Sequence, residues 1–460
     1  MLTPQERYII RTQGIPLTGA DHFHMSLERE SRTFFDASHQ AQLVIRLGPG
    51  FERNTFCQAV QKLYRNVPFL HASIRPKWGG LFGPSVYHDA EPAGSAPIHT
   101  HDPETPDRQS IYRGVPRHIR NLLNSGPIDP RQDPLIRFDL VDDGDETLLV
   151  ITWLFLLFDG HGMTNFIRLL SDTAAHPEDP VSIAWSEELV SPIDLPNTME
   201  RLRIQRSWAS TMEERLHPEP ASLAGPIRSM PKQLDYEVHR FPPEETDAFD
   251  KLARSEAGVI SPMLFYLAIT IRAHHRVFLH RSSVPSQYLV PVAVNLRRGT
   301  DIDPTFRNHV TFLWFGVEPS ELDDRQMLIN SLKEQKRSQI QDGFPRSMAI
   351  AMENNRYVPT ELNRRMMRAQ AGGELCSFFF AYTGHLFPEV SELGGGKIRD
   401  GFPTAGVPPS PGSSFVWSLV HGQLNLTHLF QQGVVRPDER ELMLKQIFDE
   451  LPETVEQPSG

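Results

Sequence analysis

One histidine lies in the expected connection between a strand and a helix. Asp159, Gly160 and His161 follow the apolar run Val150–Phe158 and precede Gly162–Ser171, which has the apolar spacing of a helix. Connections of this kind often face binding and catalytic sites, and an imidazole can take a proton from an attacking amine or hydroxyl. Two interpretations of His161 stay open: a relocated general base, and a loop side chain that bonds locally at the helix N-terminus.

Two more histidines, His22 and His24, lie close together in the segment GADHFHM. On an extended segment alternate side chains point to one face, so both imidazoles would lie together, as some metal sites require. No third ligand group stands out, so we expect structural roles and predict no metal. His274 and His275 lie in an expected helix, where neighbouring side chains point about 100° apart, and no shared site is expected from them.

Several common catalytic signatures are missing from the sequence. Gly394–Gly396 is a run of three glycines, but no GK[ST] follows it, so a phosphate-binding P-loop is excluded. The GxSxG elbow of hydrolases, the HExxH zinc motif and the dinucleotide fingerprint GxGxxG do not occur either. Histidines and hydroxyl groups therefore remain the candidates for chemistry.

The composition is that of an ordinary globular protein. Of 460 residues, 39% are hydrophobic and 22% charged, which suggests two or three domain-sized units. The net charge is −11 and no basic stripe is visible, so no nucleic-acid partner is expected. No apolar run has the length of a membrane span or a signal peptide. Cys57 and Cys376 are the only cysteines, which favours the reducing cytoplasm over a disulfide-stabilised fold.

The elements that must position these residues alternate between strands and helices. Strands are predicted at Gln42–Leu47, Leu135–Leu140, Thr147–Phe158, Leu234–Arg240, Tyr288–Asn295, Asn308–Val317, Phe378–Thr383, Ser414–Val420 and Gln423–Phe430. Helices are predicted at Glu52–Val67 (with Asn54 as N-cap), Gly162–Ser171, Pro243–Ala257, Ser261–Phe278, Arg325–Gln341 and Glu439–Leu451. Four proline-rich stretches are expected to be surface connections: Glu91–Asp107, His176–Pro196, His217–Lys232 and Phe402–Gly412. The alternation occurs twice, which predicts two α/β lobes.

The order of these segments resembles a known superfamily. The segments that carry the likeness are YRNVPFLHASI (64–74), PLIRFDLVDDGDETLLVITW (134–153), LFLLFDGHGMTNFIRLL (154–170), YLVPVAVNLRR (288–298), RNHVTFLWFGV (307–317) and the last hairpin, SFVWSLVHGQLNLTHLFQQGVV. Together they resemble the condensation domains and acyl-CoA-dependent acyltransferases, which include chloramphenicol acetyltransferase. The resemblance implies a V-shaped pseudo-dimer of two lobes around a central tunnel. Residues 1–180 would form the N-terminal lobe, 181–232 a connecting segment and 233–460 the C-terminal lobe, with a bridging loop near 384–413.

The central motif departs from the superfamily pattern HHxxxDG. With Asp159-Gly160 aligned to DG, Leu154 and Phe155 stand where the two histidines would be. In the superfamily the second histidine takes the proton of the acceptor, which a phenylalanine ring cannot do. The resemblance further implies that Asp159 is structural and forms a buried ion pair with Arg297. The DFGWG motif of the plant branch has no counterpart.

The resemblance also implies what the tunnel holds. A thioester donor, on CoA or on the phosphopantetheine arm of a carrier protein, would meet a small-molecule acceptor there, with no tightly bound cofactor. Thr383 would donate a hydrogen bond to the developing oxyanion, or else be a satisfied hydroxyl at a strand end. The remaining residues expected to line the tunnel are Phe155, Gly160, His22, His24, Tyr382 and Ser414.

Three functions from different classes follow. The first is acyl or aminoacyl transfer in natural-product biosynthesis without the usual histidine, by His161 or by an acceptor that needs no base. The second is cyclisation, rearrangement or elimination in the same tunnel, favoured by the apolar residues around Phe155. The third is a non-catalytic scaffold that recruits a carrier protein or another enzyme.

Overall fold

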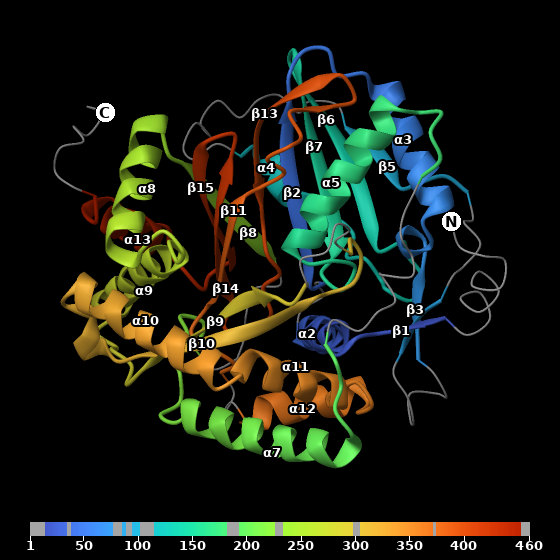
Figure 1. Ribbon diagram of the computed structural model, residues 1–460. Helices are drawn as coiled ribbons and strands as arrows, with labels where there is room; N and C mark the ends of the chain where they lie inside the picture. The colour runs from blue at the N-terminus through green and yellow to red at the C-terminus, as the bar shows by residue number, and fades with distance from the viewer. Residues whose placement is uncertain are drawn as a thin grey trace.

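The computed structural model of the protein describes residues 14–34, 38–76, 85–88, 94–101, 115–181, 193–225, 233–297, 304–370 and 374–451. Two six-stranded sheets lie beside each other, each with its own helices, and a layer of helices lies below them in the view of Figure 1. A three-stranded sheet is formed by β1 (Ile15–Pro16), β4 (Val86–His88) and β3 (Ser73–Arg75). None of the helices within the described ranges is long and apolar enough to cross a membrane.

The first large sheet belongs mainly to the N-terminal half. Its strand order is β12 (Glu392–Leu393), β13 (Gly396–Pro403), β2 (Gln40–Leu47), β7 (Glu146–Leu154), β6 (Ile136–Asp143) and β5 (Ile98–His101). Helices α3 (Arg53–Asn66) and α5 (Gly160–Ala175) cover one face. Phe56, Val60 and Leu63 of α3 lie one helical turn apart and are buried in this core, because their spacing puts them on one side of the helix.

The second sheet has the strand order β10 (Val310–Val317), β9 (Tyr288–Asn295), β11 (Phe379–His385), β14 (Ser413–Val420), β15 (Gln423–Gln431) and β8 (Leu234–Arg240). Its core contains side chains of α8 (Pro243–Ala257), α9 (Met263–His280), α10 (Arg325–Gln341) and α13 (Pro437–Asp449). A separate apolar cluster, including Val44 and Val150 of the first sheet and Val238 and Leu429 of the second, joins the two sheets. The lobes are therefore held together by apolar packing.

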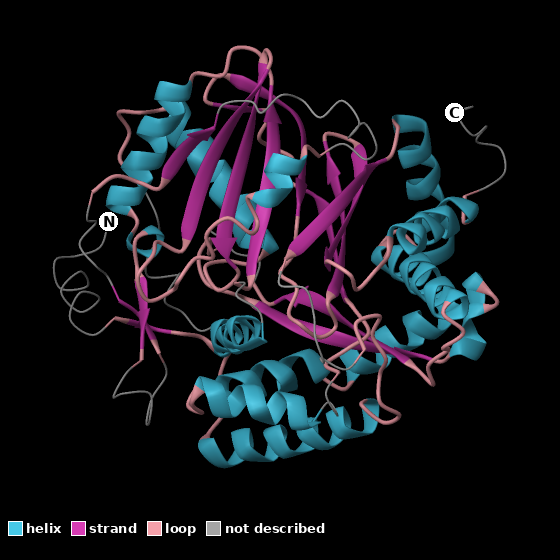
Figure 2. Cartoon of the chain, turned by 180° about the vertical axis from the view of Figure 1, so that it is seen from behind, coloured by secondary structure: helices cyan, strands magenta, loops and turns pink. Residues whose placement is uncertain are grey.

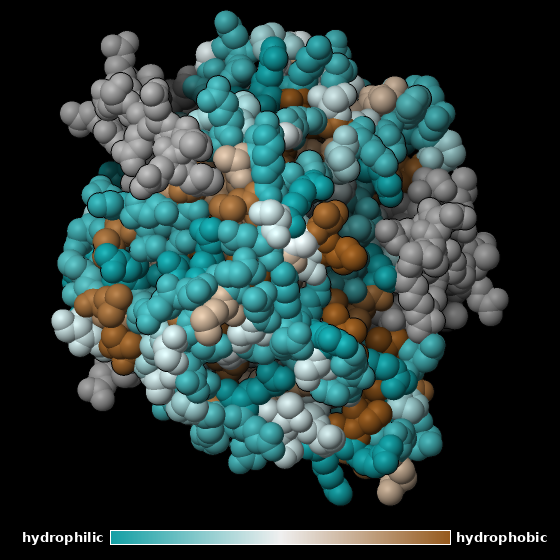
Figure 3. All heavy atoms as spheres, turned by 60° about the vertical axis from the view of Figure 1, so that its left-hand side comes forward, coloured by the Kyte–Doolittle hydropathy of each residue, from teal (hydrophilic) through white to brown (hydrophobic). Residues whose placement is uncertain are grey.

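The lower layer consists of α2 (Gly19–Phe34), α7 (Thr198–Arg215), α11 (Phe344–Asn355) and α12 (Thr360–Gln370), which Figure 2 shows from behind. Short helices occur at Pro68–Leu70, Arg117–Asn121 and Pro319–Leu322. The face shown in Figure 3 is mostly hydrophilic, with hydrophobic side chains in small separate groups. Small scattered groups are normal for a protein surface.

Most predicted strands and helices occur within two residues of their expected bounds, and β8, α8, β9 and α10 coincide with them. The N-cap of α3 is Glu52, so Asn54 lies inside that helix. The predicted strand at 147–158 ends at Leu154, and Phe155 begins a turn. The turn is fixed from the second lobe, because the side-chain amide of Asn308 donates to the carbonyls of Phe155 and Leu156, both at 3.0 Å.

Three segments contain more regular structure than the sequence indicated, and for the first of them the expected extended backbone is corrected. The GADHFHM segment is helical rather than extended, since it forms the start of α2. The segment expected to connect the lobes contains the 18-residue helix α7, with Asn197 as its N-cap. The expected bridging loop near 384–413 contains β12 and β13, and β13 pairs antiparallel with β2 through Ile398–Leu47 and Phe402–Val44. A strand from the C-terminal half thus completes the N-terminal sheet.

Candidate functional site

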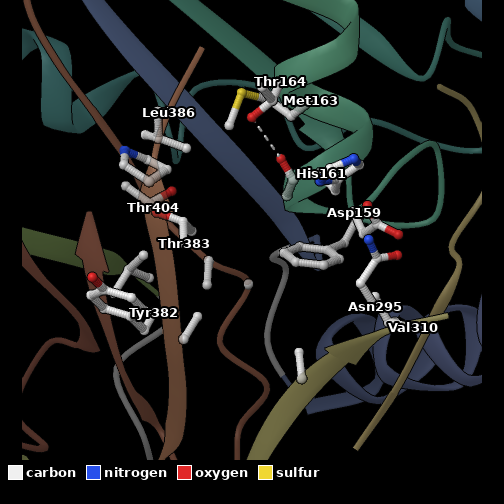
Figure 4. A pocket seen from close by; sticks show the side chains of 18 of the residues that line it. Asp159, His161, Met163, Thr164, Asn295, Val310, Tyr382, Thr383, Leu386 and Thr404 are labelled. Atoms are coloured by element: carbon white, nitrogen blue, oxygen red, sulfur yellow. Dashed lines mark hydrogen bonds between the residues drawn. The ribbon is translucent and has the colours of Figure 1, made fainter. Parts of the chain in front are cut away.

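A cavity of about 520 Å³ lies where the two lobes meet. The turn after β7 and the start of α5 form one wall, and β11 with residues 403–406 forms another. Figure 4 shows Asp159, His161 and Thr164 on the α5 side, and Tyr382 and Thr383 on β11 across the cavity. Both lobes therefore contribute side chains to one space, which the predicted tunnel requires.

Asp159 and Arg297 form a buried ion pair beside this cavity. Both Asp159 oxygens accept from the Nη1 of Arg297, at 2.8 and 2.9 Å, and the two side chains are 3% and 1% exposed. The backbone amides of Gly162 and His309 donate to the same carboxylate, each at 2.9 Å. Burial alone would raise the pKa of Asp159, but Arg297 and these amides outweigh it and lower the pKa below its ordinary value. The carboxylate thus fastens α5 to the second lobe.

The ring of Phe155 lies in a cluster with two histidines. Its centroid is 4.7 Å from that of His24, a stacked contact, and 5.5 Å from that of His39. The Nδ1 of His24 lies 3.3 Å from the Nε2 of His39. Burial is the main cause that lowers the pKa of His24 to about 3 and the pKa of His39 well below its ordinary value. Both imidazoles are therefore neutral at neutral pH.

His39 is a cavity residue that sequence reasoning missed. It directly precedes β2, where its carbonyl accepts from the amide of Phe155 at 3.1 Å and its own amide donates to Glu28 at 2.5 Å. The ring is also fixed by Gly406, because a Cβ on that residue would lie 2.4 Å from the His39 ring. The only sequence signal was a histidine at the start of a predicted strand, which is too common to indicate a site.

His161 and Gly160 occupy the first turn of α5 and line the cavity, with His161 exposed. A Cβ on Gly160 would lie 3.9 Å from the Cγ2 of Thr383, so α5 and β11 approach closely here. The Oγ1 of Thr383 donates to the carbonyl of Trp417 at 3.3 Å. Its hydroxyl would have to leave this carbonyl before it could donate to an oxyanion.

Tyr382 and Ser414 also line the cavity, from β11 and β14. The Tyr382 ring stacks on Tyr266 with a centroid distance of 5.0 Å, which fixes its orientation. Ser414 is 1% exposed, and its hydroxyl makes no hydrogen bond within the described part of the chain. It is thus a polar group that a bound molecule can satisfy.

His22 does not line this cavity, in contrast to its predicted place. Residues two apart on a helix point about 200° from each other, so His22 and His24 face opposite sides of α2. The shared metal-binding face considered for them therefore does not exist. Among the residues that the structure describes, no three histidine, cysteine, aspartate or glutamate side chains are grouped as metal ligands.

The proline-rich segment 402–412 is buried rather than a surface connection. It continues from β13 between the lobes, and Pro403, Thr404, Ala405 and Gly406 line the cavity. The Oγ1 of Thr404 accepts from the amide of Gln42 at 2.9 Å, which fixes the segment to β2. Of the other proline-rich stretches, 91–93, 102–107, 182–192 and 226–232 lie outside the described residues.

The sequence matches no protein-family model and no curated protein. Solved structures do share its fold. The first condensation domain of the CDA synthetase has a TM-score of 0.67 at 14% identity, over 95% of this chain and 96% of that one. The trichothecene 15-O-acetyltransferase of Fusarium sporotrichioides has 0.65 at 12%, over 94% of each chain. Polyketide synthase associated protein 5 of Mycobacterium tuberculosis has 0.61 at 14%, over 94% and 98%. The predicted condensation-domain and acetyltransferase fold is confirmed.

Proposed function

We propose that the protein is a condensation-type acyl or aminoacyl transferase of natural-product biosynthesis. Its donor would be a thioester, carried on CoA or on the phosphopantetheine arm of a carrier protein, and its acceptor a small molecule. The observation that carries this proposal is the cavity between the lobes, with His161 and Thr383 on facing walls. Condensation domains and an acetyltransferase among the solved structures of this fold support it. Cys57 and Cys376 are free thiols, which agrees with a reducing cytoplasm as the proposed compartment.

The cavity provides groups for each part of the reaction. An acceptor nitrogen or oxygen attacks the thioester carbon, the carbon–sulfur bond breaks, and the acceptor's proton passes through a base to the leaving thiolate. His161 and His385 both line the cavity and are exposed, and His161, which follows Asp159-Gly160, would be that base. Thr383 would donate to the oxyanion after releasing the Trp417 carbonyl.

Transfer without a histidine base is also physically possible. Orientation of the two reactants alone supplies roughly 7–11 kcal/mol in favourable cases, while a general base typically adds about 10²–10⁴-fold. An amine acceptor that is already neutral needs only the first contribution. Phe155 takes no part in proton transfer, since its ring lacks a basic atom.

The test is product analysis by mass spectrometry with acyl-CoA and acyl-pantetheine donors and a panel of amines and alcohols. If His161 is the base, His161→Ala should lower the rate at limiting substrate by about 10²–10⁴-fold. If the acceptor needs no base, the variant should be nearly as active and the rate should follow the titration of the amine. His176→Ala, at the exposed end of α5, is the matched control. Turnover by neither protein on any thioester would contradict the proposal.

A second candidate is a cyclisation, rearrangement or elimination of one bound molecule in the same cavity. The cluster of Phe155 with the neutral imidazoles of His24 and His39 favours it, because such a wall stabilises an apolar intermediate and keeps water away. Release of a changed product without consumption of a second substrate would distinguish it. A scaffold that only binds a carrier protein would show complex formation with no product at all.

A further inference from the structure

A second cavity, of about 130 Å³, lies in the helical layer below the two sheets. Residues of α2, α7, α11, α12, the edge strand β10 and its neighbours β9 and β11 line it. Five of the chain's 13 methionines belong to this lining: Met212, Met348, Met352, Met366 and Met367. Methionine is flexible and polarisable, and surfaces rich in it adapt to apolar ligands of different shape. The concentration of methionines marks an adaptable apolar site.

Among the described residues, those that line both this second cavity and the larger one are all phenylalanines. Phe23, Phe312 and Phe379 line both cavities. Phe23 and Phe312 contact each other with a centroid distance of 5.5 Å. Phe23 and Phe379 are partly exposed, so a rotation of their rings can join the two spaces. A chain attached to a group in the larger cavity therefore has a short route into the second.

The second cavity also contains polar groups without partners. His22 is 2% exposed, and neither of its ring nitrogens makes a hydrogen bond to any residue in the described ranges. The backbone of Val358 is near enough to affect this imidazole but does not complete a hydrogen bond. The indole nitrogens of Trp208 and Trp314 are likewise buried and have no hydrogen-bond partner among the residues that the structure describes. Because buried polar groups are normally hydrogen-bonded, a ligand with an acceptor atom would satisfy them.

We propose that the second cavity binds the apolar tail of the acyl donor, and that it prefers tails with a neutral hydroxyl or carbonyl group. That the tail belongs to a thioester donor rests on the proposed function. That the second cavity binds an apolar chain rests on the residues of the cavity itself. Burial is the main cause that lowers the pKa of His22 to about 4, so the imidazole is neutral and disfavours a charged tail. A methylene occupies about the volume of a liquid water molecule, roughly 30 Å³, so at least about four fit.

Binding can be measured without turnover. Straight-chain acyl-pantetheine thioesters of increasing length are titrated, and a second set carries bromine at the tail end, which quenches tryptophan fluorescence at short range. Each methylene that enters the cavity should tighten binding about fourfold. Trp153 lines the larger cavity and is expected to be quenched by short tails as well. The signal of the second cavity is the further quenching that appears only with tails long enough to reach Trp208 and Trp314. An affinity that does not change with chain length would overturn the proposal, because the cavity would then hold only water.

Two matched substitutions on α7 test whether the gain in affinity with chain length arises in the second cavity. Ala209 lines the second cavity, whereas the next residue, Ser210, is exposed. Ala209→Phe should remove the gain with chain length and the further quenching by long brominated tails, and Ser210→Phe should keep both. Met366→Phe fills the same space from a partly exposed position and serves if Ala209→Phe does not fold. Retention of the chain-length gain in a folded filled variant would contradict the assignment.

The polar preference is tested with His22→Leu. This variant should bind plain tails as the parent does and tails with a hydroxyl about tenfold more weakly. Chain-length-dependent binding with no turnover would mean that the proposed transferase function is wrong and the binding site is right. Turnover with no dependence on tail length would mean that the transferase function is right and the assignment of the second cavity is wrong. If acceptor molecules rather than acyl tails quench the two tryptophans, the cavity belongs to the acceptor and the assignment to the donor is wrong.

Discussion

Asp159 and Phe155 are only four residues apart, yet their surroundings differ in kind. The Asp159 carboxylate is fully engaged, by Arg297 and by two backbone amides, and it joins α5 to the second lobe. Phe155 contacts the rings of His24 and His39, whose Nε2 and Nδ1 atoms, respectively, are buried and make no hydrogen bond within the described part of the chain. The charged residue therefore joins the two lobes, whereas the residue four positions earlier presents an apolar ring to the cavity. Substitutions at the two positions can therefore change the contact between the lobes and the cavity wall separately.

The largest loss of stability is expected from the substitution Asp159→Asn. Arg297 would remain buried without its counter-charge, and we expect a loss of about 3–5 kcal/mol in the free energy of unfolding. Asp142→Asn is the control, because Asp142 pairs with Arg53 at the surface and should contribute less than about 1 kcal/mol. Urea unfolding monitored by circular dichroism measures both. An Asp159→Asn variant as stable as the parent but without activity would assign Asp159 a direct chemical role.

A smaller loss is expected from Gly162→Ala in the same turn. A Cβ there would lie 2.2 Å from the carbonyl oxygen of Thr305 and 2.8 Å from the Cβ of Phe158, so backbone must shift. We expect a cost of about 1–3 kcal/mol. Gly160→Ala, two residues earlier, meets nothing closer than 3.9 Å and should stay within about 0.5 kcal/mol. Equal thermal shifts for the two variants would show that the contact between α5 and residue 305 is not tight.

The two regions should also respond to acid at different pH. The lowered pKa values of His24 and His39 mean that only the unfolded chain takes up their protons, so stability is complete above about pH 6.5 and falls below it. Each contributes a slope of up to roughly 1.4 kcal/mol per pH unit. The pKa of Asp159 is also lowered, and its contribution is lost only below about pH 4.

Unfolding free energies at pH 7.0 and 5.5 separate these contributions. His24→Phe should reduce the loss between the two values by up to about 1.4 kcal/mol. Asp159→Asn should lower stability at both values and leave that difference as in the parent. A His24→Phe variant with the parent's pH dependence would mean that the buried imidazole is not neutral in the folded state.

The sequence predicted helices and strands well where the arrangement of apolar residues determines the type of element. Strand β9 was predicted with its bounds because it is a short, nearly continuous apolar run, and helix α10 because its apolar residues follow the helical spacing. The Asp159–Arg297 pair, 138 residues apart, could be inferred only from the resemblance to a known superfamily. Spacing alone does not bring two such distant residues together.

The elements that were missed lack such a pattern. Helix α2 buries charged side chains, and one of them, Glu30, is paired with Arg364 of a distant helix at 2.9 Å. Because its sequence is polar, α2 was not predicted as a buried helix. The contact between His24 and His39 was therefore not predicted either. Strand β13 was missed because its partner β2 lies about 350 residues earlier and because glycines and a proline interrupt its apolar residues.

A small change in stability, below about 1 kcal/mol, is expected from Phe155→His, which tests the role of this position directly. The new ring would replace a partly exposed one that already stacks on His24. Burial should keep the new imidazole neutral near pH 7, as it does for its neighbours, so it can accept a proton.

If the cavity accommodates a thioester together with an alcohol, Phe155→His should raise transfer to the hydroxyl acceptor, by up to about 10²–10⁴-fold. Phe155→Leu removes the ring without adding a base and should give no gain. Rates with acyl-CoA and acyl-pantetheine donors measure the difference between the two variants. A folded Phe155→His variant with no gain, alongside a parent that turns over no thioester, would favour the one-substrate reaction or the scaffold, because the position of the missing base would then not face an acyl group at all.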